Sequence, residues 1–437
     1  MRIDTLRVEN FRGFAEREFA FHPQFNVLIG DNATGKTATL EALAVALDPW
    51  IKGATGERAR SIEKSEDVRV QANREGGVIV LDRQYPCVVE GEAAFIYAGE
   101  NLMDMPFRRH VPNERARNRT KDTQRMEGAA QILMSEAAKG EGRGQLPLVA
   151  YYGTARRKGI KSSEKKRRVP TGQAALHRTL GYRDALDARI DPRLFVDWMK
   201  RQALITSQDD NVEPPSYTAV REALTALVEG ATNVRYLFKA EALVVEFADG
   251  RVLPIDLLSD GQKGVLRLVG DLARRAALLN PGLAGDVLAK TPGVVLIDEL
   301  GLHLHPNWQR RIVGDLRRTF PAVQFIVATH SPFVVQSLHE SELIPLDTQP
   351  IPQTDNLSIQ EIAEGLMGVA ETSVGDGYAS AKERAHTYLN TLEDDSLTPE
   401  ERLATLEDKL ADPHAPYADN PAFQAVLERK RIAKLGA

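Results

Sequence analysis

The octapeptide GDNATGKT at residues 30–37 constrains the fold of this chain more than any other stretch. It fits the pattern G-x4-G-K-[ST], whose glycines let backbone N–H groups converge on phosphate oxygens at the start of a helix. An apolar run at residues 25–30 precedes it. After it, apolar residues recur at the spacing of one helix face: Leu40, Leu43, Ala44 and Leu47. This order of strand, loop and helix predicts an α/β fold with a phosphate-binding loop.

Such a loop predicts a site for ATP with Mg²⁺. Lys36 should reach the β- and γ-phosphates, and the hydroxyl of Thr37 should ligate the metal. The residues of this segment that we expect to bind ATP are Gly30, Asp31, Asn32, Ala33, Thr34, Gly35, Lys36, Thr37 and Ala38.

Two later apolar runs end in the polar residues that ATP hydrolysis requires. The run GVVLIDE ends in Asp298 and Glu299, and the run VQFIVATH ends in His330. The runs flank a helix-like segment, which predicts parallel strands buried on both faces. We expect Asp298 to hold Mg²⁺ through water and Glu299 to orient or deprotonate the attacking water. His330 should sense the γ-phosphate, so the expected catalytic residues are Lys36, Glu299 and His330.

The pattern along the chain predicts four parts. Residues 66–99 hold short alternating runs typical of an antiparallel meander. We therefore expect a first ATPase lobe at 1–99, a mostly helical insertion at 100–233 with a buried strand near 148–152, a second lobe at 234–340, and a helical C-terminal region at 341–437.

Composition excludes some functional classes. The net charge is −5 and the pI is about 6.1, so no global charge favours nucleic acid or an acidic membrane. Cys87 is the single cysteine, which excludes an intramolecular disulfide and fits a reducing compartment. No apolar run approaches the ~18 residues of a membrane span. These features predict a soluble cytoplasmic protein without a membrane partner.

Several further motifs together resemble one ATPase group. LSDGQKG at 258–264 is similar to the signature motif of ABC ATPases. LRVENFRGF at 6–14, IDELGLHLHP at 297–306 and ATHSPFVV at 328–335 resemble the first hairpin, the Walker B motif with D-loop, and the H-loop of the RecF, SMC and OLD group. The resemblance implies an ABC-type head, with a mixed sheet, helices and an antiparallel meander. It also implies that Arg12 contacts the nucleotide.

In the ABC class, a signature closes over a nucleotide held by a different nucleotide-binding unit. This chain has one phosphate loop and one signature motif. The resemblance therefore implies a homodimer, with larger assemblies left open. In that dimer the ATP on one chain is contacted in trans by four residues of the other: Ser259, Asp260, Gly261 and Gln262.

A narrower resemblance rests on LVAYYGTAR at 148–156, ALLNP at 277–281 and DNPAFQAVLERKRIAKLG at 419–436. These stretches resemble the PtuA-type ATPases of Septu and retron-linked anti-phage systems, which pair with a separately encoded HNH nuclease. The resemblance implies an ATPase that regulates such a nuclease. About 220 residues without heptads separate Thr37 from Leu258, which departs from the coiled coil of the SMC branch.

Some interpretations stay open at this stage. A RecF-like DNA-binding ATPase of repair or recombination is the alternative function. The eight basic residues within 156–168 are either a solvated run or a contact for DNA. His303 and His305 form either a metal-binding pair or part of a loop between two active sites. Residues 355–437 are either a helical cap on the ATPase core or a docking platform for the nuclease.

Overall fold

The computed structural model describes residues 1–57, 60–75, 78–97, 101–119, 123–139, 145–153, 178–188, 191–210, 212–302, 304–347, 359 and 362. They belong to the first of two compact units, Met1–Met367, whereas the second unit, Gly368–Ala437, lies outside the described residues. The expectations for the basic run at 156–168, for His303 and for nearly all of 355–437 therefore concern residues that the structure does not describe.

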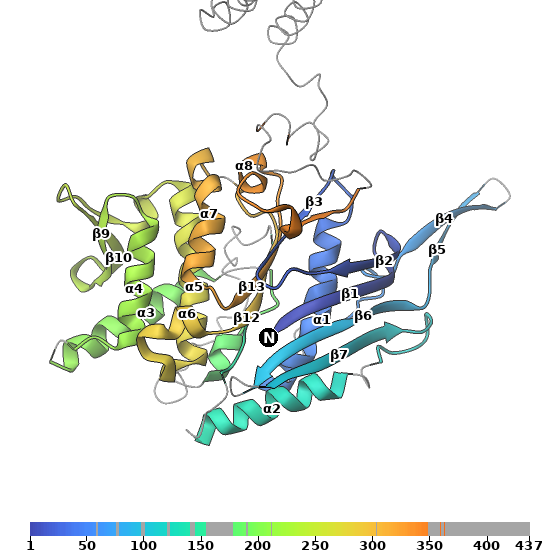
Figure 1. Cartoon of the computed structure of the whole chain (residues 1–437), viewed down its shortest axis with the longest axis horizontal. Helices are drawn as coiled ribbons and strands as arrows, with labels where there is room; N and C mark the ends of the chain where they lie inside the picture. The colour runs from blue at the N-terminus through green and yellow to red at the C-terminus, as the bar shows by residue number, and fades with distance from the viewer. Residues whose placement is uncertain are drawn as a thin grey trace, which may run out of the picture. The chain divides into compact units, whose positions relative to one another are not determined.

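A five-stranded parallel sheet forms the centre of the first unit (Figure 1). Its order is β14 (Leu343–Pro345), β3 (Phe25–Ile29), β13 (Val323–Ala328), β12 (Gly293–Ile297) and β8 (Leu148–Tyr152). Every residue of β3, β8, β12 and β13 is buried, which explains their uninterrupted apolar sequences. The α/β prediction and the buried strand at 148–152 are confirmed. The expectation of a helical region from residue 341 is wrong at residues 343–345. These residues form β14, which joins the core sheet by pairing with β3.

An antiparallel sheet lies beside the parallel one, in the order β2 (Phe14–Ala20), β1 (Arg2–Phe11), β6 (Cys87–Tyr97) and β7 (Asn101–Val111). The hairpin of β4 (Val70–Glu75) and β5 (Val78–Arg83) projects from it in Figure 1. Antiparallel pairing is thus present at 66–99, but β6 pairs with β1 and β7 instead of continuing the β4–β5 hairpin as a meander. β7 corrects the expectation of a mostly helical stretch from residue 100, because it continues the sheet by pairing with β6 over its whole length.

Helix α1 (Lys36–Thr55) follows the phosphate loop and packs against both sheets. Leu40, Leu43, Leu47 and Trp50 are fully buried along it. The indole nitrogen of Trp50 donates a hydrogen bond to the hydroxyl of Tyr182 at 3.0 Å. This continuous burial fixes the start of α1, and therefore the loop before it, relative to the parallel sheet.

The remaining elements are mainly helices. They are α2 (Gln124–Lys139), α3 (Pro192–Gln208), α4 (Pro215–Leu227), α5 (Asp260–Leu279), α6 (Val287–Lys290), α7 (Pro306–Thr319) and α8 (Pro332–Val335), with a small sheet of β9 (Ala231–Leu237), β10 (Ala242–Phe247) and β11 (Val252–Pro254). Within the part of the chain that the structure describes, none of the helices has the length and apolarity needed to span a membrane. The division into two ATPase lobes stays a prediction.

A buried ionic cluster joins α5 to the core sheet. The carboxylate of Asp271 pairs with Arg274 and Arg275, at 2.7 Å each, and accepts a hydrogen bond from the Tyr152 hydroxyl at 2.8 Å. Arg275 also donates to the backbone oxygens of Gly181 and Arg183 at 2.9 Å. Burial alone would raise the pKa of Asp271, but the two guanidinium groups outweigh it and hold that pKa well below its ordinary value.

We expect Asp271→Asn to lower the free energy of unfolding by about 3 kcal/mol, because it leaves two buried guanidinium groups without their counter-charge. Urea denaturation at pH 7 measures this loss. The depressed pKa means that the wild-type contribution is present at neutral pH and is lost as the pH falls through the folded-state pKa.

Asp286→Asn is the matched control. Asp286 pairs with Lys290 at 2.7 Å, but both side chains are exposed on the surface. Its loss should stay below about 0.5 kcal/mol. Equal losses for the two variants would contradict a structural role for the buried cluster.

Candidate active site

The phosphate loop has the backbone that its glycines predict. Gly30 has φ 140°, Gly35 has φ 108° and Ala33 has φ 67°, all on the left-handed side of conformational space. A Cβ at Gly35 would lie 2.3 Å from Cζ of Phe14, so only glycine fits there. Phe14 of the FRGF stretch therefore packs directly on the loop and holds it against β2.

Lys36 lies across its own loop. Its ammonium donates to the backbone oxygens of Gly30 at 2.6 Å and Asp31 at 2.8 Å. Burial lowers the pKa of Lys36, and this effect is opposed by nearby carboxylates, of which Glu299 and Asp298 act most strongly. A buried cation between the loop and these acids fits a site for the phosphates of ATP.

Asp347, which follows β14, was not expected at this loop. Its carboxylate accepts a hydrogen bond from the backbone N–H of Asp31 at 3.3 Å. The sequence gives no sign of this contact, because Asp347 lies more than 300 residues further along and outside any motif. Within the phosphate loop, the hydroxyl of Thr34 donates to the backbone oxygen of Asp31 at 2.9 Å. The Asn32 side chain is exposed.

Thr37 and Asp298 meet although 261 positions separate them. The Thr37 hydroxyl donates to the Asp298 carboxylate at 3.0 Å, and Asp298 is 3% exposed. Threonine hydroxyl and aspartate carboxylate oxygens are ligands that Mg²⁺ accepts when a nucleotide supplies phosphate oxygens. The donor set therefore fits the metal expected for this site.

Glu299 and His330 also lie side by side. The Glu299 carboxylate is 3.3 Å from Nε2 of His330. Parallel pairing of β12 with β13 explains this, because the two residues follow neighbouring strand ends. Glu299 has φ 54°, a strained conformation for a glutamate that is often found at functional sites. The roles of both residues stay predictions.

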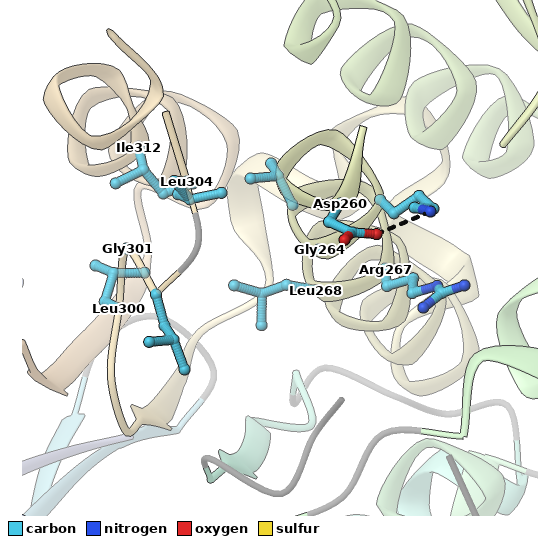
Figure 2. A pocket seen from close by; sticks show the side chains of 11 residues that line it. Asp260, Gly264, Arg267, Leu268, Leu300, Gly301, Leu304 and Ile312 are labelled. Atoms are coloured by element: carbon cyan, nitrogen blue, oxygen red, sulfur yellow. Dashed lines mark ion pairs between the residues drawn. The ribbon is translucent and has the colours of Figure 1, made fainter. Parts of the chain in front are cut away.

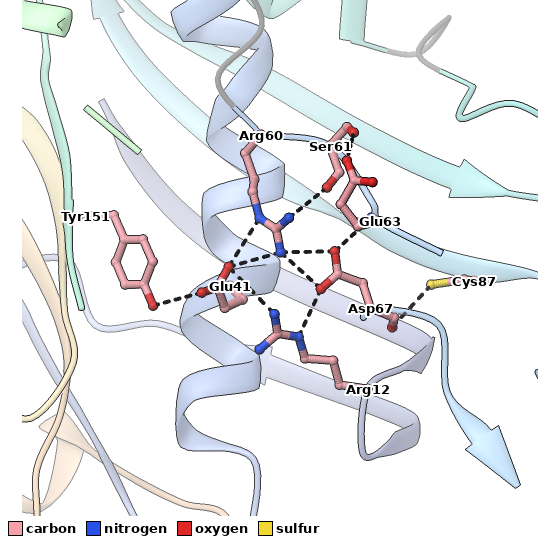
Figure 3. Close-up of polar contacts among 8 residues, drawn as sticks. All are labelled: Arg12, Glu41, Arg60, Ser61, Glu63, Asp67, Cys87 and Tyr151. Carbon is pink, nitrogen blue, oxygen red and sulfur yellow. Dashed lines mark hydrogen bonds and ion pairs between the residues drawn. The ribbon is translucent and has the colours of Figure 1, made fainter. Parts of the chain in front are cut away.

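Arg12 belongs to a polar cluster that motif analysis missed (Figure 3). Its guanidinium donates to Asp67 at 2.9 Å. Arg60 bridges Asp67, at 3.0 Å, and Glu41, at 3.1 Å. The Tyr151 hydroxyl donates to Glu41 at 3.2 Å. Arg12, Arg60, Glu41 and Tyr151 line a polar cavity of about 500 Å³. Only Arg12 carried a signal in the sequence, through its place in FRGF.

The signature residues begin α5. The Ser259 hydroxyl accepts from the backbone N–H of Gln262 at 3.3 Å, and the Gln262 side chain accepts from the Ser259 N–H at 3.1 Å. Ser259 and Asp260 are exposed, and Gly261 lies in the first turn. In the view of Figure 1, α5 and α1 lie on opposite sides of β12 and β13. Ser259 and Gln262 hydrogen-bond to each other in this turn rather than to Thr37 or Asp298.

A small pocket separates the start of α5 from the loop after Glu299. Its volume is about 100 Å³, and Figure 2 shows Gly264 and Leu268 of α5 on one side with Leu300 and Leu304 on the other. Next to this loop, Nδ1 of His305 accepts a hydrogen bond from the N–H of Asn307 at 3.4 Å and caps α7. His305 therefore has a structural role, whereas His303 lies outside the described residues.

The geometry predicts separable effects of substitutions at this site. Lys36→Ala should abolish ATP binding, because the phosphates lose their counter-charge. Glu299→Gln should keep binding but reduce turnover by about 100-fold or more. His330→Ala should reduce turnover with less effect on binding. Binding of a fluorescent ATP analogue and phosphate release measure the two properties.

Glu18→Gln is the control for the same chemical change, since Glu18 is an exposed side chain on β2. It should leave turnover unchanged. Hydrolysis by Glu299→Gln at the wild-type rate would show that the water-positioning residue is another one.

A parallel sheet in which one strand ends in a phosphate loop and another ends in a buried aspartate followed by a glutamate defines a P-loop ATPase. Two family models match the chain: "AAA domain" at residues 5–191 and "AAA domain, putative AbiEii toxin, Type IV TA system" at residues 182–336. Solved structures that align with it include the SMC head domain from Thermotoga maritima, at 15% identity and a TM-score of 0.42, over 81% of this chain and 97% of that one.

Curated relatives include two retron proteins. The Retron Ec83 probable ATPase of Escherichia coli is 24% identical over 78% of this chain and 71% of its own, and the Retron Vc95 probable ATPase of Vibrio cholerae is 22% identical over 78% and 73%. The Septu protein PtuA of Bacillus thuringiensis is 30% identical over 30% of this chain and 36% of its own. The chain thus matches AAA ATPase domain models and is similar to ATPases of retron and Septu systems.

Proposed function

We propose that Lys36, Thr37, Asp298, Glu299 and His330 hydrolyse Mg-ATP. Lys36 binds the phosphates, while Thr37 and Asp298 hold Mg²⁺, which supplies charge neutralisation at the transferred phosphate. Glu299 orients the attacking water, and His330 contacts the γ-phosphate. The observation that supports this most strongly is the convergence of the Thr37–Asp298 bond, at 3.0 Å, and the Glu299–His330 pair, at 3.3 Å, beside the phosphate loop.

Two chains bind two ATP molecules head to tail in this proposal. Ser259 is exposed and caps the start of a 20-residue helix, whose positive dipole end favours an anion. The Ser259 side chain hydrogen-bonds to Gln262 within that turn, and α5 lies across β12 and β13 from α1 in Figure 1. A signature so placed reaches the phosphates of a second copy, with two-fold symmetry between the chains.

Mixing two inactive variants tests the exchange of residues between chains. Ser259→Arg blocks the signature and Lys36→Ala blocks the phosphate loop. In their heterodimer one composite site carries both lesions and the other carries neither. We therefore expect ATP hydrolysis to reappear on mixing, up to about half of the wild-type rate per dimer when pairing is complete.

Each variant mixed with itself is the control and should stay inactive. Light scattering of Glu299→Gln should report a dimer that forms with Mg-ATP. A strictly monomeric Glu299→Gln protein, or mixtures without regained activity, would argue against the shared site.

The output of this cycle, we propose, is control of a separately encoded HNH nuclease in anti-phage defence in the cytoplasm. The similarity to retron ATPases and to PtuA supports this assignment. A RecF-like role in repair has narrower support, from the 46% identity to RecF of Staphylococcus aureus over 43 residues, which is 10% of this chain.

Expression of the native operon distinguishes the two. We expect a nuclease subunit to co-purify with this chain, with a mass that fits at least two ATPase chains per complex. Phage-infection assays of the Glu299→Gln operon should show lost protection. Unchanged protection with that variant, or a replication protein as the sole companion, would contradict the defence role.

A further inference from the structure

One side chain of α7 connects the loops that follow β12 and β13. The loop after β12 contributes residues 300–302 and 304, next to Glu299, and the loop after β13 contributes residues 329–331 around His330. The amide nitrogen of Gln309 donates to the backbone oxygens of Gly301 at 3.1 Å and Leu304 at 2.9 Å. Its amide oxygen accepts from the hydroxyl of Ser331 at 2.6 Å.

These contacts determine the orientation of the Gln309 amide. Backbone oxygens can only accept hydrogen bonds, so the NH₂ group must face Gly301 and Leu304. The amide oxygen is then directed to Ser331, which is 7% exposed. The single planar amide thereby makes hydrogen bonds to both loops. A carboxylate of the same shape could only accept the bond from Ser331, because it has no N–H to donate to Gly301 and Leu304.

Two further contacts join the loop after β12 to the loop after β13 and the helix that follows it; we call this contact region the loop junction. The hydroxyl of Thr329 donates to the backbone oxygen of Leu300 at 2.6 Å. Gly301 has φ 97°, and a Cβ there would lie 3.3 Å from a methyl group of Val334 and 3.6 Å from Cγ of Gln309. The two loops are therefore packed and hydrogen-bonded to each other at residues that adjoin Glu299 and His330 in the chain.

We infer that Gln309 is a positioning residue for ATP hydrolysis, which holds Glu299 and His330 in register by tying their two loops together. The inference rests on the proposed roles of Glu299 and His330. The hydrogen bonds of the Gln309 side chain go to Gly301, Leu304 and Ser331 rather than to Glu299 or His330, so its effect acts through the two loops. Breaking its bonds to Gly301 and Leu304 frees the loop that Glu299 begins, and the 3.3 Å separation from His330 is then no longer fixed.

The selective variant is Gln309→Glu, which keeps the acceptor for Ser331 and turns two donor contacts into repulsion between oxygens. We expect kcat to fall about tenfold with KM changed less than about twofold, because ATP binds mainly to the phosphate loop. Gln124→Glu makes the same chemical change at an exposed position of α2 and should leave kcat unchanged.

A double-mutant cycle separates positioning from a general structural role. If Gln309 acts through His330, Gln309→Glu in the His330→Ala background should slow hydrolysis by less than about twofold. Fully additive losses, or an unchanged kcat in the single variant, would overturn the inference. Failure of the assigned site would show separately, as wild-type turnover by Glu299→Gln.

Thr329→Val provides a second route if Gln309→Glu loses ATP binding or its folded state. This substitution removes the hydroxyl that donates to the backbone oxygen of Leu300, with little change of side-chain shape. It therefore weakens the loop junction through a residue of the loop after β13. The same fall in kcat and the same non-additivity with His330→Ala are expected. Additive losses here would again overturn the role of the junction.

Discussion

Parallel pairing of β3, β13 and β12 is the constraint on which the site depends. The three strands end at one edge of the sheet, and each end delivers a different group: the phosphate loop, His330, and the pair of Asp298 and Glu299. The strands are buried on both faces, so their register cannot shift without moving the core. The 3.0 Å bond between Thr37 and Asp298 follows from that register.

Two further contacts connect this edge of the parallel sheet to the antiparallel sheet and to α5. Phe14 of the antiparallel sheet packs directly against Gly35, where there is no space for a side chain. On the other side, Asp271 joins the signature helix α5 to Tyr152 of β8, and the backbone oxygen of Tyr152 accepts the N–H of Asp298 at 2.7 Å. A short chain of bonds therefore runs from the candidate metal ligand Asp298 to the helix that Ser259 caps. The buried charges of this cluster attach α5 to the core sheet.

Strand, loop and helix around residues 25–47 could be predicted from sequence because local periodicity and a glycine pattern specify them. The meeting of Thr37 with Asp298 could be predicted too, since parallel strands must end together. The contacts of Asp347, Arg60 and Gln309 could not, because each depends on tertiary packing of segments that no motif relates. β7 and β14 were missed for a similar reason: an edge strand gains its stability from pairing with a neighbour more than from its own sequence.

The claim most open to direct measurement is that one ATP lies between two copies of the chain. Cys87 is buried, so introduced cysteines react without competition from it. Chains with Asn32→Cys and chains with Ser259→Cys, both in the Glu299→Gln background, can be mixed and treated with a short bifunctional cross-linker. The account predicts a cross-linked species of two chains that forms with Mg-ATP and is absent without nucleotide. Cross-linking that is indifferent to ATP, or no mixed dimer at all, would contradict it.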